Sequence, residues 1–196
     1  MEVKREYYLN QLISHKHNGL IKIISGIRRC GKSYLLSELF RKHLLAEGVK
    51  EDHIIHIALD DYEKKQYRNP DNCYQYVKSS IKDDEMYYLL LDEVQMMDSF
   101  EDVLNGFLHI KNLDVYVTGS NSKFLSSDVV TEFRGRGDEI RVYPFSFAEF
   151  YSAVGGDWSD AWREYYTYGG MPLILSKKTD EEKAKYLQDL FKETYI

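Results

Sequence analysis

One stretch of eight residues constrains the fold of this chain more than any other. Gly26-Ile27-Arg28-Arg29-Cys30-Gly31-Lys32-Ser33 fits the pattern G-x-x-x-x-G-K-[ST], whose backbone amides wrap the phosphates of a nucleotide. Residues 20–25 before it read as a short buried strand, and residues 33–47 after it carry apolar side chains at helical spacing. Because such a loop needs a strand before it and a helix after it, the sequence predicts a phosphate-binding loop rather than an ordinary glycine-rich turn.

The parts of this loop have different expected roles. Gly26 and Gly31 permit close approaches that a Cβ would block, so the loop amides can turn toward phosphate oxygens. Lys32 is expected to reach the β- and γ-phosphates, and the Ser33 hydroxyl to bind Mg²⁺. For Arg28 and Arg29 the sequence leaves open whether they contact phosphate or face solvent. The predicted nucleotide contacts are Gly26, Ile27, Arg28, Arg29, Cys30, Gly31, Lys32, Ser33 and Tyr34.

Two carboxylates end the third predicted strand. Residues 87–91 are apolar throughout, as in strands that are buried on both faces of a parallel sheet, and Asp92 and Glu93 follow them. Open α/β sheets bind ligands at this carboxyl edge. Asp92 is therefore the candidate magnesium ligand beside Ser33, and Glu93 is the candidate base for an attacking water. The alternative, an acidic pair closing a surface strand, fits the apolar run before it poorly.

The fourth predicted strand ends in polar residues. Thr118-Gly119-Ser120-Asn121 follows an apolar stretch, and Ser120 or Asn121 is predicted to hydrogen-bond the attacking water or the γ-phosphate. An N-cap for the following helix explains the same residues equally well, and it need not exclude that role.

An arginine pair precedes the fifth predicted strand. Arg136, with Arg134 as second candidate, could stabilise the charge that develops on the γ-phosphate, in this subunit or in a neighbouring one. A salt-bridged loop is an equally good interpretation of these arginines.

Composition narrows the class of protein. The chain of 196 residues is 43% hydrophobic, enough for one core with an appendage. Its 26 basic and 32 acidic side chains leave a net charge of −6, which argues against a surface that coats nucleic acid. Two cysteines and six histidines show no disulfide or metal-ligand spacing. No signal-peptide core or transmembrane run is present, so we expect a cytoplasmic protein without a membrane partner.

The order of these motifs resembles the AAA superfamily of P-loop ATPases, in which a glutamate stands beside the magnesium aspartate. More narrowly, the chain is similar to a prokaryotic family of ATP-binding AAA proteins over nearly its whole length. The resemblance is carried by residues 25–33, 91–95, 117–121, 134–136, 144–150 and 169–172.

The resemblance implies a fold and a domain organisation. We expect an α/β protein with a three-layer α/β/α P-loop core, built on a mainly parallel five-stranded sheet of the AAA type. Residues 1–152 would form this core with an N-terminal helix. Residues 153–196 would begin a helical lid or a linker to a missing C-terminal domain, because chains of this family are usually about twice as long.

The resemblance also implies a function. It makes ATP and Mg²⁺ the cofactors and Mg-ATP hydrolysis the reaction, driving a conformational switch in a longer protein and proceeding weakly in this part alone. A homo-oligomer, and a DNA or protein partner bound through the C-terminal domain, are compatible with it. Two other functions remain open: a P-loop kinase of a small molecule, and a nucleotide-gated binding module with negligible hydrolysis.

Overall fold

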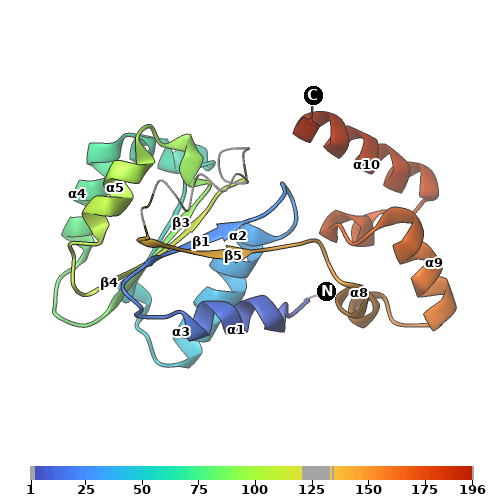
Figure 1. Cartoon of the computed structure of the whole chain (residues 1–196), viewed down its shortest axis with the longest axis horizontal. Coiled ribbons are helices and arrows are strands. Elements are labelled where there is room, and N and C mark those ends of the chain that lie inside the picture. Colours follow the sequence, from blue (N-terminus) through green and yellow to red (C-terminus); the bar gives the residue numbers. More distant parts are fainter. Residues whose placement is uncertain (1–2, 121–132, 134, 196) are drawn as a thin grey trace.

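The core of the protein is a five-stranded parallel sheet. The computed structural model describes residues 3–120, 133 and 135–195 (Figure 1). Its strand order is β2-β3-β4-β1-β5, so β4 separates the strand that enters the phosphate loop from the strand that ends in Asp92. The strands are β1 Ile21–Ser25, β2 Ile54–Ala58, β3 Tyr87–Asp92, β4 Leu113–Thr118 and β5 Gly137–Arg141.

Helices cover both faces of this sheet, which confirms the predicted three-layer α/β/α fold (Figure 1). On one face, leucines and Phe40 of the helical segment after the loop pack with α1 against the sheet. On the other face, α4 and α5 pack against β3 and β4. The core helices are α1 Glu6–Ser14, α2 Lys32–Tyr34, η1 Leu35–Phe40, α3 Arg41–Ala46, α4 Pro70–Ser80 and α5 Phe100–Phe107, and the short turns are η2 Glu51–His53, η3 Tyr62–Arg68 and η4 Val94–Met96.

The helix after the loop departs from the regular α-helix that its spacing predicts. Its middle, η1, is a π-helical segment between α2 and α3. Within this stretch the Ser37 hydroxyl donates a hydrogen bond to the Ser33 carbonyl at 2.7 Å. Side chains that bond into the helical ladder accompany such local changes of helical geometry.

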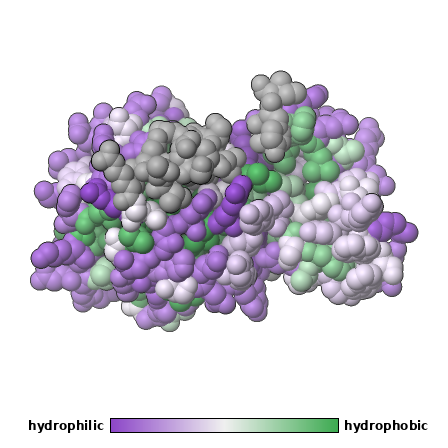
Figure 2. All heavy atoms as spheres, viewed as in Figure 1, coloured by the Kyte–Doolittle hydropathy of each residue, from purple (hydrophilic) through white to green (hydrophobic). Residues whose placement is uncertain are grey.

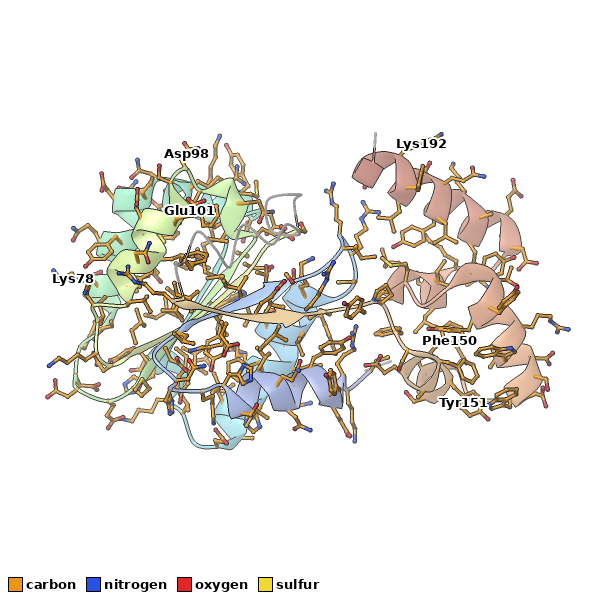
Figure 3. All side chains as sticks on the ribbon, viewed as in Figure 1. Lys78, Asp98, Glu101, Phe150, Tyr151 and Lys192 are labelled. Carbon is orange, nitrogen blue, oxygen red and sulfur yellow. The ribbon has the colours of Figure 1, made fainter. Side chains whose placement is uncertain are left out.

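The C-terminal residues form a helical unit with its own apolar cluster. It consists of α8 Phe147–Val154, α9 Trp158–Tyr168, η5 Pro172–Ser176 and α10 Asp180–Tyr195. A capping box between Ser146 and Glu149 starts α8. Phe150 is fully buried in this unit, and Figure 3 shows it beside Tyr151 among the aromatic side chains of these helices. Since α8 packs with α9, this apolar cluster extends to both sides of the boundary predicted at residue 152.

The described surface is largely polar. On the face shown in Figure 2, hydrophobic residues form separate patches within a mostly hydrophilic surface. Within residues 3–120, 133 and 135–195, no helix has the length and apolar character needed to cross a membrane.

Candidate nucleotide-binding site

The phosphate loop lies between β1 and α2, at the carboxyl edge of the sheet. Gly26 and Gly31 have positive φ angles of 141° and 102°, respectively. A Cβ on Gly26 would lie 2.1 Å from the Val142 carbonyl oxygen, so only glycine lets the chain after β5 pass this close to the loop. The loop extends from β1 toward the C-terminal helices (Figure 1).

Lys32 is folded into the loop that precedes it. Its side chain is 3% exposed. The ammonium donates hydrogen bonds to the carbonyl oxygens of Gly26 at 2.9 Å and Ile27 at 3.0 Å. The loop therefore surrounds a positive charge at the N-terminus of the following helix.

Ser33 of α2 and Asp92 of β3 meet, although β3 and the strand before the loop, β1, are not neighbours in the sheet. The Ser33 hydroxyl donates to Asp92 Oδ1 at 3.1 Å, and the Thr118 hydroxyl at the end of β4 donates to the same oxygen. Asp92 is 5% exposed, and this burial raises the pKa of its carboxyl, while the hydrogen bonds from Thr118 and Ser33 act in the opposite direction.

Glu93 turns away from Asp92 at the end of β3. Its backbone has a φ of 54°, which is uncommon for a residue other than glycine, and its N–H donates to Thr118 Oγ1 at 3.0 Å. The carboxylate accepts hydrogen bonds from Ser120 Oγ at 2.8 Å and from the Gln95 amide. The two adjacent carboxylates therefore have separate hydrogen-bond partners, and the Thr118 hydroxyl links the Asp92 carboxylate to the backbone of Glu93.

A cavity of about 350 Å³ adjoins the loop. Gly31 and Tyr34 form its loop side, and Phe145 and Pro172 contribute apolar walls from the C-terminal segment. Arg5, which precedes α1, completes this group of residues. The cavity is thus shared by the N-terminal segment, the loop and the helical unit.

The other loop residues face different surroundings. Arg29 Nη2 lies 3.1 Å from Glu193 Oε2 of α10, and Arg28 Nη1 lies 3.9 Å from the same atom. The sequence left open whether these arginines contact phosphate or face solvent, and neither interpretation includes this ion pair with a C-terminal helix. Ile27 is half-buried between core and helical unit. Cys30 is fully buried, and its burial raises the pKa of the thiol.

Arg136 is not brought to the phosphate loop. It precedes β5, and its carbonyl accepts a hydrogen bond from the N–H of Ile21 at the start of β1. Its guanidinium donates to Asn105 of α5 at 3.2 Å. Arg136 lies where β1 and β5 begin, whereas the phosphate loop follows Ser25, where β1 ends. The five residues of β1 separate these two edges of the sheet by roughly 16 Å. Asn121 and Arg134 lie outside the described residues.

Comparison with known proteins decides the family. A family model described as an AAA domain matches residues 18–151, which contain both the phosphate loop and the β3 carboxylates. The chain belongs to this AAA domain family. It is therefore a nucleotide-binding, ATPase-type domain of the AAA superfamily of P-loop ATPases.

Two relatives of this AAA domain are longer proteins. An uncharacterised protein of Haemophilus influenzae is 34% identical over 179 residues, covering 88% of this chain and 44% of the relative. An uncharacterised protein of Methanocaldococcus jannaschii is 28% identical over 185 residues, covering 86% of this chain and 39% of the relative. The AAA domain thus spans less than half the length of either relative.

Solved structures resemble the AAA domain in fold. A DNA polymerase III gamma subunit-related protein of Thermotoga maritima has a TM-score of 0.53 at 13% identity, covering 98% of this chain and 62% of that one. Hsp104 of S. cerevisiae in complex with casein has a TM-score of 0.54 at 16% identity, covering 84% of this chain and 30% of Hsp104. The Orc1 protein of Aeropyrum pernix in complex with DNA has a TM-score of 0.51 at 11% identity, covering 98% and 67%.

Two residues of the AAA domain's candidate site, Thr118 and Gln95, lie within the sequence motifs but have no role predicted from the sequence. Thr118 bonds both Asp92 and the backbone of Glu93, and Gln95 bonds the Glu93 side chain. Thr118 acquires its role because Leu91 pairs with Val117, so the residues that follow them also lie side by side. This register is not visible in either strand alone. For Gln95 the signal is its place two residues after Glu93, and for Thr118 it is a hydroxyl at the end of a predicted strand, just before the polar candidates Ser120 and Asn121.

Proposed function

We propose that this AAA domain binds Mg-ATP, hydrolyses it and so drives a conformational change in a longer protein. The observation that carries the proposal is the 3.1 Å contact between Ser33 of the loop helix and Asp92 of β3. It joins two half-sites across the intervening strand β4. A glycine-rich turn and a surface acidic pair would have no reason to meet in this way.

The loop supplies the groups for phosphate binding. Backbone amides and the helix N-terminus favour an anion, and Lys32 adds a mobile positive charge. Its ammonium now donates to two neutral carbonyls, of Gly26 and Ile27, and anionic phosphate oxygens are stronger acceptors for the same donors. The cavity beside Gly31 and Tyr34 is the place for the nucleobase, because its walls are largely apolar.

The donor atoms present fit a magnesium ion. Ser33 Oγ and Asp92 Oδ1 are oxygen ligands, which Mg²⁺ prefers, and they lie at one point beside the loop. Bound there, Mg²⁺ supplies charge neutralisation for the phosphates. The hydrogen bonds from Ser33 and Thr118 hold the Asp92 carboxyl in place for this role.

Glu93 is the candidate base for hydrolysis. Its carboxylate takes a proton from the attacking water, whose oxygen forms a bond to the γ-phosphorus. The bond between this phosphorus and the bridging oxygen breaks, which leaves ADP and inorganic phosphate. Ser120 and Gln95 hold the carboxylate on one of its oxygens.

The same hydrogen bonds favour a second candidate function. Ser120 and Gln95 both donate to Oε2 of Glu93, so they occupy an oxygen that an attacking water would otherwise contact. A domain whose glutamate stays bound to Ser120 and Gln95 would bind ATP and recruit a partner while hydrolysing it slowly. A nucleotide-gated binding module is therefore the alternative.

Two variants separate binding from turnover. We expect Lys32→Ala to lose most Mg-ATP affinity in an equilibrium titration, because it lacks the mobile charge on the phosphates. Glu93→Gln should bind Mg-ATP normally and release no phosphate, because the amide cannot accept the proton. Undiminished affinity in folded Lys32→Ala would contradict the site assignment.

The products that the wild-type protein forms from Mg-ATP distinguish the ATPase, the binding module and the kinase. Phosphate release that Glu93→Gln abolishes supports the ATPase. Tight binding without release supports the binding module. Transfer of the γ-phosphoryl group to an added small molecule would identify a kinase instead.

A further inference from the structure

Arg5 is a buried cation that the proposed chemistry does not use. Its side chain is 3% exposed, and its backbone has a positive φ of 48° just before α1. A buried guanidinium is unfavourable unless its donors are satisfied, and a left-handed arginine adds strain. Because both the burial of its charge and its left-handed backbone are unfavourable, Arg5 must be held in place by tertiary contacts.

Three segments of the chain meet at this guanidinium. Nη1 donates to the Cys30 carbonyl of the phosphate loop at 3.0 Å, and Nη2 donates to the Tyr143 carbonyl after β5 at 2.6 Å. Nε lies 3.0 Å from Glu149 Oε1 of α8. The planar fork of arginine suits such an arrangement, whereas a lysine ammonium is a single point charge.

The hydrogen bond from Arg5 to the Cys30 carbonyl constrains the orientation of the Cys30–Gly31 peptide. The Cys30–Gly31 peptide is trans, so its carbonyl and its N–H point in opposite directions. Gly31 has no Cβ and a φ of 102°, so this peptide unit can rotate more easily than most. Arg5 Nη1 binds this carbonyl, and a Cβ on Gly31 would lie 3.6 Å from the same nitrogen.

We propose that Arg5 is a positioning residue for phosphate binding. By holding the Cys30 carbonyl outward, it orients the Gly31 N–H toward the phosphates. A peptide turned the other way would present a carbonyl oxygen to an anion. The inference rests on the proposed function, because it assigns a residue to the same phosphate site.

The test compares Arg5→Lys with Arg68→Lys as matched control. Arg68 also donates to a backbone carbonyl, that of Leu59, at 2.7 Å, but it lies outside the loop. Dissociation constants are measured by titration calorimetry for Mg-ATP and for Mg-tripolyphosphate, which has no nucleobase. Lys32→Ala serves as the variant without phosphate binding, and thermal unfolding verifies that each protein is folded.

The positioning role predicts an equal loss for both ligands. Arg5→Lys should bind Mg-ATP and Mg-tripolyphosphate on the order of 10-fold to 100-fold more weakly, the range that corresponds to one hydrogen bond to an anion. Arg68→Lys should bind both as the wild type does. Where Arg5→Lys is too unstable to titrate, Arg5→Gln gives the same comparison without an unpaired buried charge.

Other outcomes would overturn the inference. Unchanged affinities, or a loss for Mg-ATP alone, would exclude phosphate positioning, and the second result would limit the role of Arg5 to the wall of the base cavity that it already lines. If the wild type binds neither ligand, the proposed function fails. If the wild type binds both and Arg5→Lys does so equally well, only the role of Arg5 fails.

Discussion

Thr118 links the two acidic residues of the site through one hydroxyl group. It is fully buried, donates to Asp92 Oδ1 and accepts from the N–H of Glu93 at 3.0 Å. Without this hydroxyl, a buried carboxylate would lose a donor and a strained backbone position would lose an acceptor. The geometry of both acidic residues therefore depends on a neutral side chain from another strand.

Thr118→Val should test this dependence, because valine keeps the shape and lacks the hydroxyl. We expect the free energy of unfolding to fall by about 1–3 kcal/mol, the usual cost of an unsatisfied buried polar group, and ATP turnover to fall with it. Urea unfolding and phosphate release measure the two effects. Thr118→Ser retains the hydroxyl and serves as control. A wild-type rate in Thr118→Val would show that Glu93 is oriented without it.

Cys73 of α4 gives a prediction about pH. Burial raises the pKa of this thiol to about 12, whereas an unfolded thiol ionises near pH 8.5. Between these values the native state keeps a proton that the unfolded state releases. The stabilising contribution is therefore complete below about pH 8.5, and stability falls by about 1.4 kcal/mol per pH unit above it.

Urea unfolding of the wild type and of Cys73→Ala between pH 8 and 10 measures this slope. The alanine variant loses packing at every pH but has no thiol to titrate. The stability difference between the two proteins should therefore shrink as the pH rises. A difference independent of pH would show that the thiol titrates normally in the folded protein.

Among the secondary-structure elements, the contact between the phosphate loop and the chain after β5 depends on Gly26. The N–H of Val142 donates to the Ser25 carbonyl at 2.8 Å, which extends the pairing of β1 and β5 up to the loop. At this point the Val142 carbonyl passes over Gly26. One glycine therefore serves both the loop conformation and the sheet edge.

Gly26→Ala should destabilise the protein by roughly 2–5 kcal/mol, the sum of a backbone clash and a strained φ. Gly48→Ala is the matched control, because Gly48 has a φ of 91° and nothing within 4 Å of an added Cβ. We expect about 1–2 kcal/mol there, from the backbone alone. Chemical denaturation compares them, and equal costs would mean that β5 moves aside without penalty.

The position of Arg136 relative to the phosphate loop depends on the arrangement of the whole sheet. Its guanidinium lies at the edge where the strands begin and contacts Asn105, while the phosphate loop lies at the edge where they end. An arginine there cannot reach the phosphates of its own chain across the sheet. If Arg136 stabilises the transition state, it does so for the nucleotide of a neighbouring copy.

Arg136→Ala should then bind Mg-ATP nearly normally but hydrolyse it on the order of 10³-fold more slowly, as expected for a lost arginine finger. Mixing it with Glu93→Gln should restore part of the activity, because a mixed interface can pair an intact Glu93 with an intact Arg136. Arg163→Ala, which removes an exposed arginine of α9, serves as control. Wild-type turnover in Arg136→Ala would leave it a structural residue, and a lower rate without rescue would exclude the trans arrangement.

Much of the fold could be predicted from the sequence because its signals are local. The apolar run of 87–91 and the helical spacing after Lys32 depend only on nearby residues, and they predicted β3 and the α2–α3 helical stretch. The pattern around Gly31 likewise predicted a loop between a strand and a helix, which the structure has between β1 and α2. The local sequence did not indicate the π-helical segment η1, which lies inside an otherwise regular apolar stripe.

The tertiary structure alone decided which distant residues meet. Strand order and register bring Thr118 beside Asp92, and a buried guanidinium joins Arg5 to Cys30 and Tyr143. Strand order likewise separates Arg136 from its own phosphate loop. The physical reason is that hydrophobic periodicity specifies which face of an element is buried, whereas contacts between distant residues arise only when packed elements are placed in one order and register.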